Sequence, residues 1–190
     1  METALDPVVE EVLDLYRTCG TACPSDPVSL LEHMLQTAQC AIAAGASNEM
    51  VLAAFFHDVG QLCVMQRQPD NLSGHGRKSH EKIGADFLRR RGFSERLVRL
   101  VEGYVQANRY LSFSCCEYYN KLSEANRRAL ECQGGPMSRG EARAFEHDPF
   151  FKQYVLLCRW DAQATNLNTP VIDWEEIRMR MEMALLDHWS

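Results

Sequence analysis

The residues best suited to chemistry in this 190-residue chain are histidines and aspartates in apolar surroundings. His57 and Asp58 directly follow the apolar run MVLAAFF and precede a valine and a glycine, which puts them at the end of a helix. At a helix terminus, side chains of adjacent residues can both reach one cation that lies beside the helix. Burying an imidazole and a carboxylate without partners is costly. A bound metal ion would satisfy both.

Two more residues of these types lie on apolar helices. His33 is in the middle of LLEHMLQ, and Asp161 follows Trp160 in YVLLCRWDAQA. Alone, His33 is typical of a hydrogen-bonded core histidine, and Asp161 is typical of a buried carboxylate paired with Arg159 or a distant arginine. The combination of these residues with the adjacent His-Asp pair favours metal binding instead.

Helix start and stop signals position these residues. Asp26-Pro27 is typical of a helix start and Gly45 of a helix end, so the segment VSLLEHMLQTAQCAIAA is predicted to be one helix. Ser47 as an N-cap predicts a second helix, NEMVLAAFFHDV, that ends at Gly60.

Similar signals predict helices over the rest of the chain. One is expected from about Lys78 to Arg91, and another from Ser94 to about Arg109. Further helices are expected to start at Asp6, Ser123, Ser138, Asp148 and Asp173. No alternating strand pattern, internal repeat or linker is evident. We therefore expect an all-α protein, a single domain over residues 1–190 built as a helical bundle with a metal site between helices.

Composition limits the possible functions. The chain is 46% hydrophobic and 24% charged, as in an average globular protein. Its net charge of −6 argues against nucleic-acid binding, which requires a basic face. No apolar run approaches a membrane span, and the acidic N-terminus differs from a signal peptide. We expect a cytoplasmic protein without nucleic-acid or membrane partners. Buried thiols are expected at Cys40, Cys63, Cys132 and Cys158.

A histidine, a later His-Asp pair and a still later aspartate form the pattern of the HD superfamily. The chain resembles one branch of this superfamily over much longer segments. The segments LLEHMLQTAQCA, GASNEMVLAAFFHDVGQLC, HEKIGADFLRRRGFSERLVRLVEGY and LECQGGPM look like the HD-domain mixed-valent di-iron oxygenases. Among these, the chain is most similar to those that cleave the carbon–phosphorus bond of 2-amino-1-hydroxyethylphosphonate. The resemblance runs from about Asp6 to Asp161. It implies an iron-dependent oxygenase that takes a small hydroxylated substrate and dioxygen.

The resemblance also implies a ligand set. His33, His57, Asp58 and Asp161 match the ligands of the first iron, and Asp58 would bridge to a second iron that His80 also binds. One or two iron ions are expected, although these ligand types also suit manganese or zinc.

The chain departs from this family at Tyr104, where the family has the last histidine ligand of the second iron. Two interpretations stay open. The tyrosine could bind ferric iron as a phenolate, or it could fill space beside a site that holds one metal. His75, which precedes His80, is a candidate replacement ligand.

The substrate pocket departs as well. The family's pocket histidine, lysine and serine are Gln61, Asn108 and Asn126 here, and its arginine is Cys158, next to Arg159. We interpret Gln61, Asn108, Asn126 and Arg159 as candidate substrate-binding residues. A phosphonate dianion needs cationic or N–H donors. The loss of two positive charges therefore argues that the substrate is not the family's usual one, and we expect a small hydroxylated compound that is organophosphonate-like or a less anionic relative.

Two other functions stay open behind the oxygenase. One is a metal-dependent phosphohydrolase, the commoner HD activity, and the change at Tyr104 favours it. The other is a degenerate HD module that binds a ligand without catalysis, and the retained ligand set argues against it.

Overall fold

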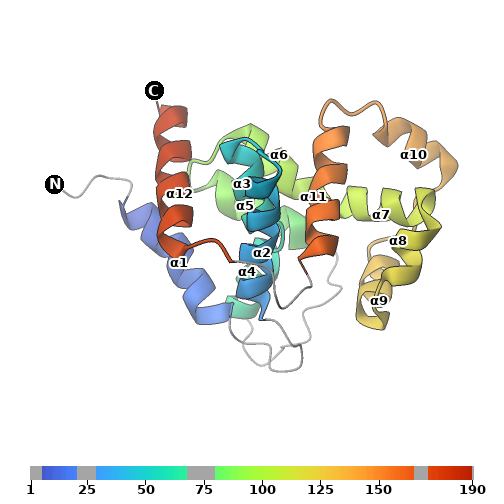
Figure 1. The fold of residues 1–190 in the computed structure, drawn as a ribbon, viewed down its shortest axis with the longest axis horizontal. Coiled ribbons are helices and arrows are strands. Elements are labelled where there is room, and N and C mark those ends of the chain that lie inside the picture. The colour runs from blue at the N-terminus through green and yellow to red at the C-terminus, as the bar shows by residue number, and fades with distance from the viewer. Residues whose placement is uncertain (1–5, 21–28, 68–79, 165–170, 190) are drawn as a thin grey trace.

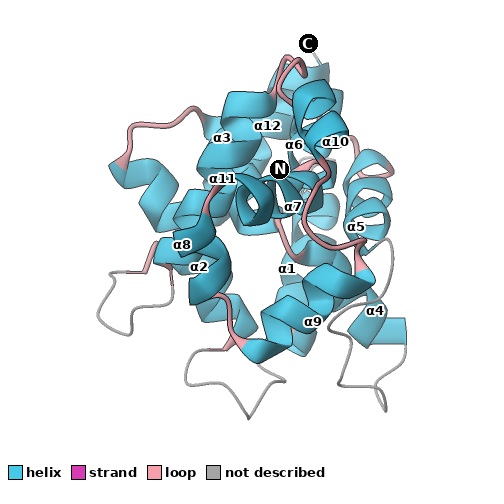
Figure 2. Ribbon diagram, turned by 90° about the vertical axis from the view of Figure 1, so that its right-hand side faces the viewer, coloured by secondary structure: helices cyan, strands magenta, loops and turns pink. Residues whose placement is uncertain are grey.

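The computed structural model describes residues 6–20, 29–67, 80–164 and 171–189 (Figure 1). Within these ranges there are twelve helices and no strand (Figure 2), which confirms the predicted all-α fold. The organisation as one domain stays a prediction. The helices are α1 (Asp6–Cys19), α2 (Leu30–Ala43), α3 (Asn48–Phe56), α4 (Val59–Arg67), α5 (His80–Arg89), α6 (Glu95–Glu102), α7 (Tyr104–Ser114), α8 (Cys116–Lys121), α9 (Glu124–Cys132), α10 (Arg139–Phe145), α11 (Phe151–Gln163) and α12 (Trp174–Trp189).

Helix α3 forms the centre of the core. Every side chain from Met50 to Phe56 is buried, and a helix that is apolar on all sides needs neighbours on all sides. Helices α2, α6, α11 and α12 supply them. The ring of Tyr16 stacks on Phe55 at 4.3 Å between centroids, and Trp174 packs edge-on against Phe55 at 6.3 Å. These contacts join α1 and α12 to one side of α3, and Figure 1 shows both helices at the opposite end of the molecule from α7–α10.

Helix α2 begins after the predicted start. Its N-cap is Ser29, whose hydroxyl accepts a hydrogen bond from the backbone N–H of Glu32, while the Glu32 carboxylate accepts one from the N–H of Ser29. This capping box satisfies N–H groups that the first turn otherwise leaves open. Residues 26–28, with the predicted Asp26-Pro27 start, lie outside the described residues. The end of α2 is followed by Gly45 at φ 68°, as predicted.

The helix predicted from Ser47 to Gly60 is in fact two helices. The chain turns at His57 and Asp58, and α4 then begins at Val59. Gly60 does not end a helix, because it lies in the first turn of α4 against the start of α5. A Cβ atom at Gly60 would lie only 1.9 Å from the carbonyl oxygen of His80. Gly84 faces it, and a Cβ there would lie 2.9 Å from the nitrogen of Gly60. Two glycines therefore let the backbones of α4 and α5 touch.

The helix predicted from Ser94 to Arg109 also divides, because Gly103 separates α6 from α7, which continues to Ser114. A Cβ atom at Gly103 would lie 2.3 Å from the ring of Tyr154, so the break lies where α11 packs closely. The predicted start at Ser94 is confirmed, since its hydroxyl accepts from the N–H of Leu97.

Other parts of the outer helices were predicted with mixed success. The caps at Ser123 and Ser138 are confirmed by hydrogen bonds from the backbone N–H groups of Asn126 and Glu141. Helix α8 was not predicted, and it has no side-chain cap bond. The prediction of a buried Cys132 is wrong, because this thiol is exposed at the end of α9.

Candidate metal centre

His57 lies in the turn between α3 and α4 with its side chain fully buried. Its Nδ1 lies 2.8 Å from the carbonyl oxygen of Ala54. A carbonyl can only accept, so Nδ1 carries the proton and Nε2 presents a lone pair. Among the described residues, His57 Nε2 is buried without a hydrogen-bond partner. The nearest carboxylate oxygens are Asp58 Oδ2 at 3.5 Å and Asp161 Oδ1 at 3.6 Å. Such a lone pair between two carboxylates suits a cation.

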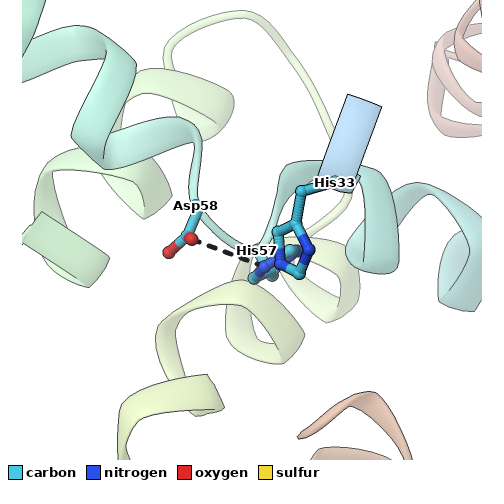
Figure 3. A group of neighbouring side chains, drawn as sticks. All are labelled: His33, His57 and Asp58. Carbon is cyan, nitrogen blue, oxygen red and sulfur yellow. Dashed lines mark ion pairs between the residues drawn. The ribbon is translucent and has the colours of Figure 1, made fainter. Parts of the chain in front are cut away.

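His33 approaches the same point from the first turn of α2. Its ring lies 5.3 Å from the ring of His57 between centroids. Potential ligand atoms of His33, His57 and Asp58 all lie within 4.8 Å of one another. Figure 3 shows the three side chains turned toward a common region, with the contact between His57 and Asp58 dashed. Thus helix α2 and the turn between α3 and α4 bring these residues together.

Asp161 is placed by the buried face of α11. This face contains Tyr154, Leu157 and Cys158, and the partly buried Asp161 follows Leu157 and Cys158 by four and three residues, while α11 packs on α2 and α7. Asp161 Oδ1 accepts a hydrogen bond from His33 Nε2 at 2.7 Å. The alternative pairing of Asp161 with Arg159 is wrong, since the Arg159 side chain is exposed on another face of α11.

The contact between His33 and Asp161 changes the acidity of both groups. Burial lowers the pKa of His33, but the hydrogen bond and charge of Asp161 outweigh it and raise that pKa to about 9. Burial raises the pKa of Asp161, but the hydrogen bond and charge of His33 hold it at about 2. The carboxylate is therefore ionised at neutral pH, as metal binding requires.

Asp58 lies between two imidazoles. One carboxylate oxygen faces His57, and the other, Oδ1, lies 4.0 Å from Nε2 of His80. His80 is the buried first residue of α5, and the contact of Gly60 with Gly84 brings this helix end close to the turn. A carboxylate in this position has the geometry to bridge two ions.

Tyr104, the first residue of α7, points into the same cluster. Its hydroxyl donates to Asp161 Oδ2 at 2.7 Å, and its ring lies 5.0 Å from that of His57 between centroids. Burial, reinforced by the negative charge of Asp161, raises the pKa of Tyr104 well above its ordinary value. The structure thus brings Tyr104 to Asp161.

Tyr118 on α8 was missed by the sequence analysis. Its hydroxyl donates to Asn108 Oδ1 at 3.3 Å. Burial raises its pKa strongly, and Cys158 and Asp161 contribute to this shift, so Tyr118 lies within electrostatic reach of the cluster. The sequence around it, CCEYYNK, shows no periodic pattern that singles out this tyrosine.

The other candidate substrate-binding residues are placed unevenly. Gln61 is half-buried one turn after Asp58, and its backbone N–H donates to the carbonyl oxygen of Asp58 at 2.9 Å. Asn126 and Arg159 are exposed, and among the described residues neither makes a hydrogen bond or ion pair to the cluster. His75 lies outside the described residues.

Comparison with known proteins identifies the family. The family model of the HD domain matches residues 30–114 of this chain. This range includes Tyr104 and four residues of the cluster, namely His33, His57, Asp58 and His80. The chain is 33% identical over 177 residues to hydroxymethylphosphonate dioxygenase of Gimesia maris, covering 93% of this chain and 88% of that protein. The chain belongs to the HD-domain oxygenase family.

Two more relatives agree with this assignment. A [1-hydroxy-2-(trimethylamino)ethyl]phosphonate dioxygenase (glycine-betaine-forming) of Leisingera caerulea is 33% identical over 147 residues, covering 76% of this chain and 74% of that protein. An uncharacterized protein of Acanthamoeba polyphaga mimivirus is 33% identical over 164 residues, covering 86% and 75%. The resemblance found in the sequence is confirmed, and this HD-domain oxygenase is an oxidoreductase. In the described parts of the chain, no helix is long and apolar enough to cross a bilayer.

Proposed function

We propose that this HD-domain oxygenase is a non-haem iron enzyme that uses dioxygen to oxidise a small hydroxylated substrate, either an organophosphonate or a less anionic relative. The observation that carries the proposal is the buried lone pair of His57 Nε2, which faces the carboxylates of Asp58 and Asp161 at 3.5 and 3.6 Å. Imidazole and carboxylate donors at such a position suit non-haem iron, and also manganese or zinc. The names of the relatives favour dioxygenase chemistry over hydrolysis.

The residues fit a metal ion without rearrangement of the fold. His33, His57, Asp58 and Asp161 would hold the first ion, and Asp58 and His80 face a second position. When bound, iron supplies Lewis acidity and the redox chemistry that dioxygen activation requires.

The chain's own residues orient these ligands. The Ala54 carbonyl fixes the tautomer of His57, so its Nε2 is presented to the ion before the ion arrives. The Tyr104 hydroxyl holds Asp161 through Oδ2, whereas the proton that His33 Nε2 shares with Asp161 Oδ1 would be released when an ion binds, because a ligating imidazole must be neutral.

Within electrostatic reach of the ligands, Tyr118 and Asn108 form a neutral pair. The Tyr118 hydroxyl donates to Asn108 Oδ1, which leaves the Asn108 amide N–H groups to donate to a substrate oxygen. Neutral donors bind a dianion less well than cations do. We therefore expect a substrate that carries less negative charge than 2-amino-1-hydroxyethylphosphonate presents at its phosphonate group, or one that binds mainly through its hydroxyl. Dioxygen and this substrate are the expected partners, in the cytoplasm and without nucleic acid.

The test is oxygen consumption by protein loaded with ferrous iron under anaerobic conditions. The substrate panel contains hydroxymethylphosphonate, 1-hydroxy-2-(trimethylamino)ethylphosphonate, 2-amino-1-hydroxyethylphosphonate and a hydroxylated carboxylate such as glycolate. We expect oxygen uptake matched by product for at least one member and poor turnover of the aminoethyl compound. Phosphate release from simple phosphate esters that continues without oxygen would overturn the proposal in favour of a hydrolase.

A further inference from the structure

Tyr104 ends a short chain of hydrogen bonds that runs through Asp161. The Tyr104 hydroxyl donates to Asp161 Oδ2 at 2.7 Å, and His33 Nε2 donates to Asp161 Oδ1 at 2.7 Å. A phenol is longer than an imidazole, so its oxygen reaches past the place where a histidine nitrogen would lie. In this chain the oxygen reaches the carboxylate of the first metal position.

This hydrogen bond gives the Tyr104 hydroxyl a role other than metal ligation. A neutral hydroxyl that donates to a carboxylate fixes the direction of that carboxylate, as partners of metal ligands commonly do. The Tyr104 ring centroid lies 5.0 Å from that of His57 in the turn after α3, and the Tyr104 carbonyl lies 3.5 Å from the Cys158 thiol of α11, so Tyr104 is held between this turn and α11.

The second metal position is correspondingly poor in ligands. Asp58 Oδ1 and His80 Nε2 face each other at 4.0 Å. Among the described residues, the one group of three potential ligands close enough to share an ion is His33, His57 and Asp58, at the first position. Catalytic metal sites typically use three protein ligands. Among the described residues the second position offers only Asp58 and His80, and two ligands are too few for tight binding.

We propose that Tyr104 is a positioning residue that holds Asp161 by a hydrogen bond, and that this chain binds one metal ion tightly where the di-iron pattern calls for two. The inference rests on the proposed metal centre. It also separates this chain from the branch it resembles, because that branch has a histidine at this place.

The test is metal stoichiometry and affinity, measured on the full chain and on Tyr104→Phe, Tyr104→His and Tyr154→Phe. Tyr154 is a matched control, since it is also buried and packs on Gly103 but makes no hydrogen bond to the cluster. Each protein is reconstituted anaerobically with ferrous iron, desalted and analysed for iron, and iron affinity is measured by competition with a chelator. Circular dichroism confirms folding.

We expect one iron per chain in the unmodified protein and in Tyr154→Phe. Tyr104→Phe should keep that stoichiometry but lose roughly 10- to 100-fold in affinity, as outer partners of metal ligands do when removed. Tyr104→His should bind two irons. Oxidised unmodified protein should lack the visible charge-transfer band of a ferric phenolate.

Three results would overturn the inference. They are two irons per chain in the unmodified protein, a visible band that Tyr104→Phe removes, or an unchanged affinity in Tyr104→Phe. Failure of the unmodified protein to bind any iron would instead refute the proposed metal centre itself, so the two failures are distinguishable.

Discussion

The proposed metal centre has two sides, and the potential ligand atoms lie closer together on one side than on the other. On the side formed by α2, α11 and the turn between α3 and α4, Asp161 Oδ1 lies 2.7 Å from His33 Nε2 and 3.6 Å from His57 Nε2. On the side formed by α5, α7 and α8, His80 lies 4.0 Å from Asp58, and Tyr118 and Asn108 form a neutral hydrogen-bonded pair. Under the proposed function, metal capture and substrate choice would be carried by different helices.

The largest effect should come from removing a ligand on the side where the potential ligand atoms lie closer together. His57→Ala deletes the buried donor that lies between two carboxylates, so we expect iron affinity to fall by more than ~100-fold, beyond the usual loss for an outer partner. His80→Ala should lower it by less than ~10-fold, because the first-ion ligands stay intact. Iron per chain and chelator competition measure both, with the exposed His147→Ala as control. Equal losses in the two variants would remove the distinction between the sides.

The next effect tests the contact that joins the two sides. Gly60→Ala puts a methyl group where the carbonyl oxygen of His80 already lies, so we expect a loss of roughly 1–3 kcal/mol in the free energy of unfolding, as for an overpacked core. Urea denaturation measures it. Gly140→Ala is the matched control, because this helical glycine has no neighbour within 4 Å of an added Cβ. That change should stabilise the protein by about 0.5–1 kcal/mol. Equal outcomes for both variants would show that α4 and α5 are not in close contact.

A smaller effect should come from the hydrogen-bonded pair of Tyr118 and Asn108. Tyr118→Phe removes one neutral hydrogen bond, to Asn108, which is worth about 0.5–1.5 kcal/mol, so we expect a two- to ten-fold loss in kcat/KM at unchanged iron content. Steady-state oxygen uptake measures it on the best substrate of the panel. Tyr119→Phe is the control, since its ring lies against Arg127 instead. A loss of iron in Tyr118→Phe would mean that this residue supports the metal and not the substrate.

The smallest effect is expected from removing the positive charge of Arg159. Arg159 is exposed on α11, while its neighbour Cys158 is buried against α7, so Arg159→Ala should change KM by less than about two-fold. A large rise in KM would show that this arginine reaches the substrate and would restore a charged pocket.

Local chemistry explains which parts of this structure were predictable. Capping residues such as Ser94 and Ser138 act on N–H groups within three residues, so short patterns located those helix starts correctly. The clustering of His33, His57, Asp58 and Asp161 also agrees with the expectation from the sequence, although their role as ligands stays a prediction. The helix breaks were missed for a different reason.

Those breaks depend on contacts between helices that are distant in sequence. Gly60 was interpreted as a stop, yet its function is to admit the backbone of His80 from α5. Gly103 likewise accommodates the ring of Tyr154. Tyr118 was overlooked because its proximity to the cluster depends on how α8 folds back beside α7. No spacing along the chain records such contacts.

The bare crossing of α4 and α5 has one more consequence. The gap between Asp58 and His80 depends on the close approach of the α4 and α5 backbones at Gly60, so the width of the proposed second metal position is controlled by a contact that contains no ligand side chain. A methyl group added at Gly60 would push His80 away from Asp58. No residue is smaller than glycine, so no substitution there can bring His80 closer. The spacing is thus already at its lower limit. A redesign that seeks a shorter distance between two ions must change the ligands, because the backbones of α4 and α5 cannot come closer together.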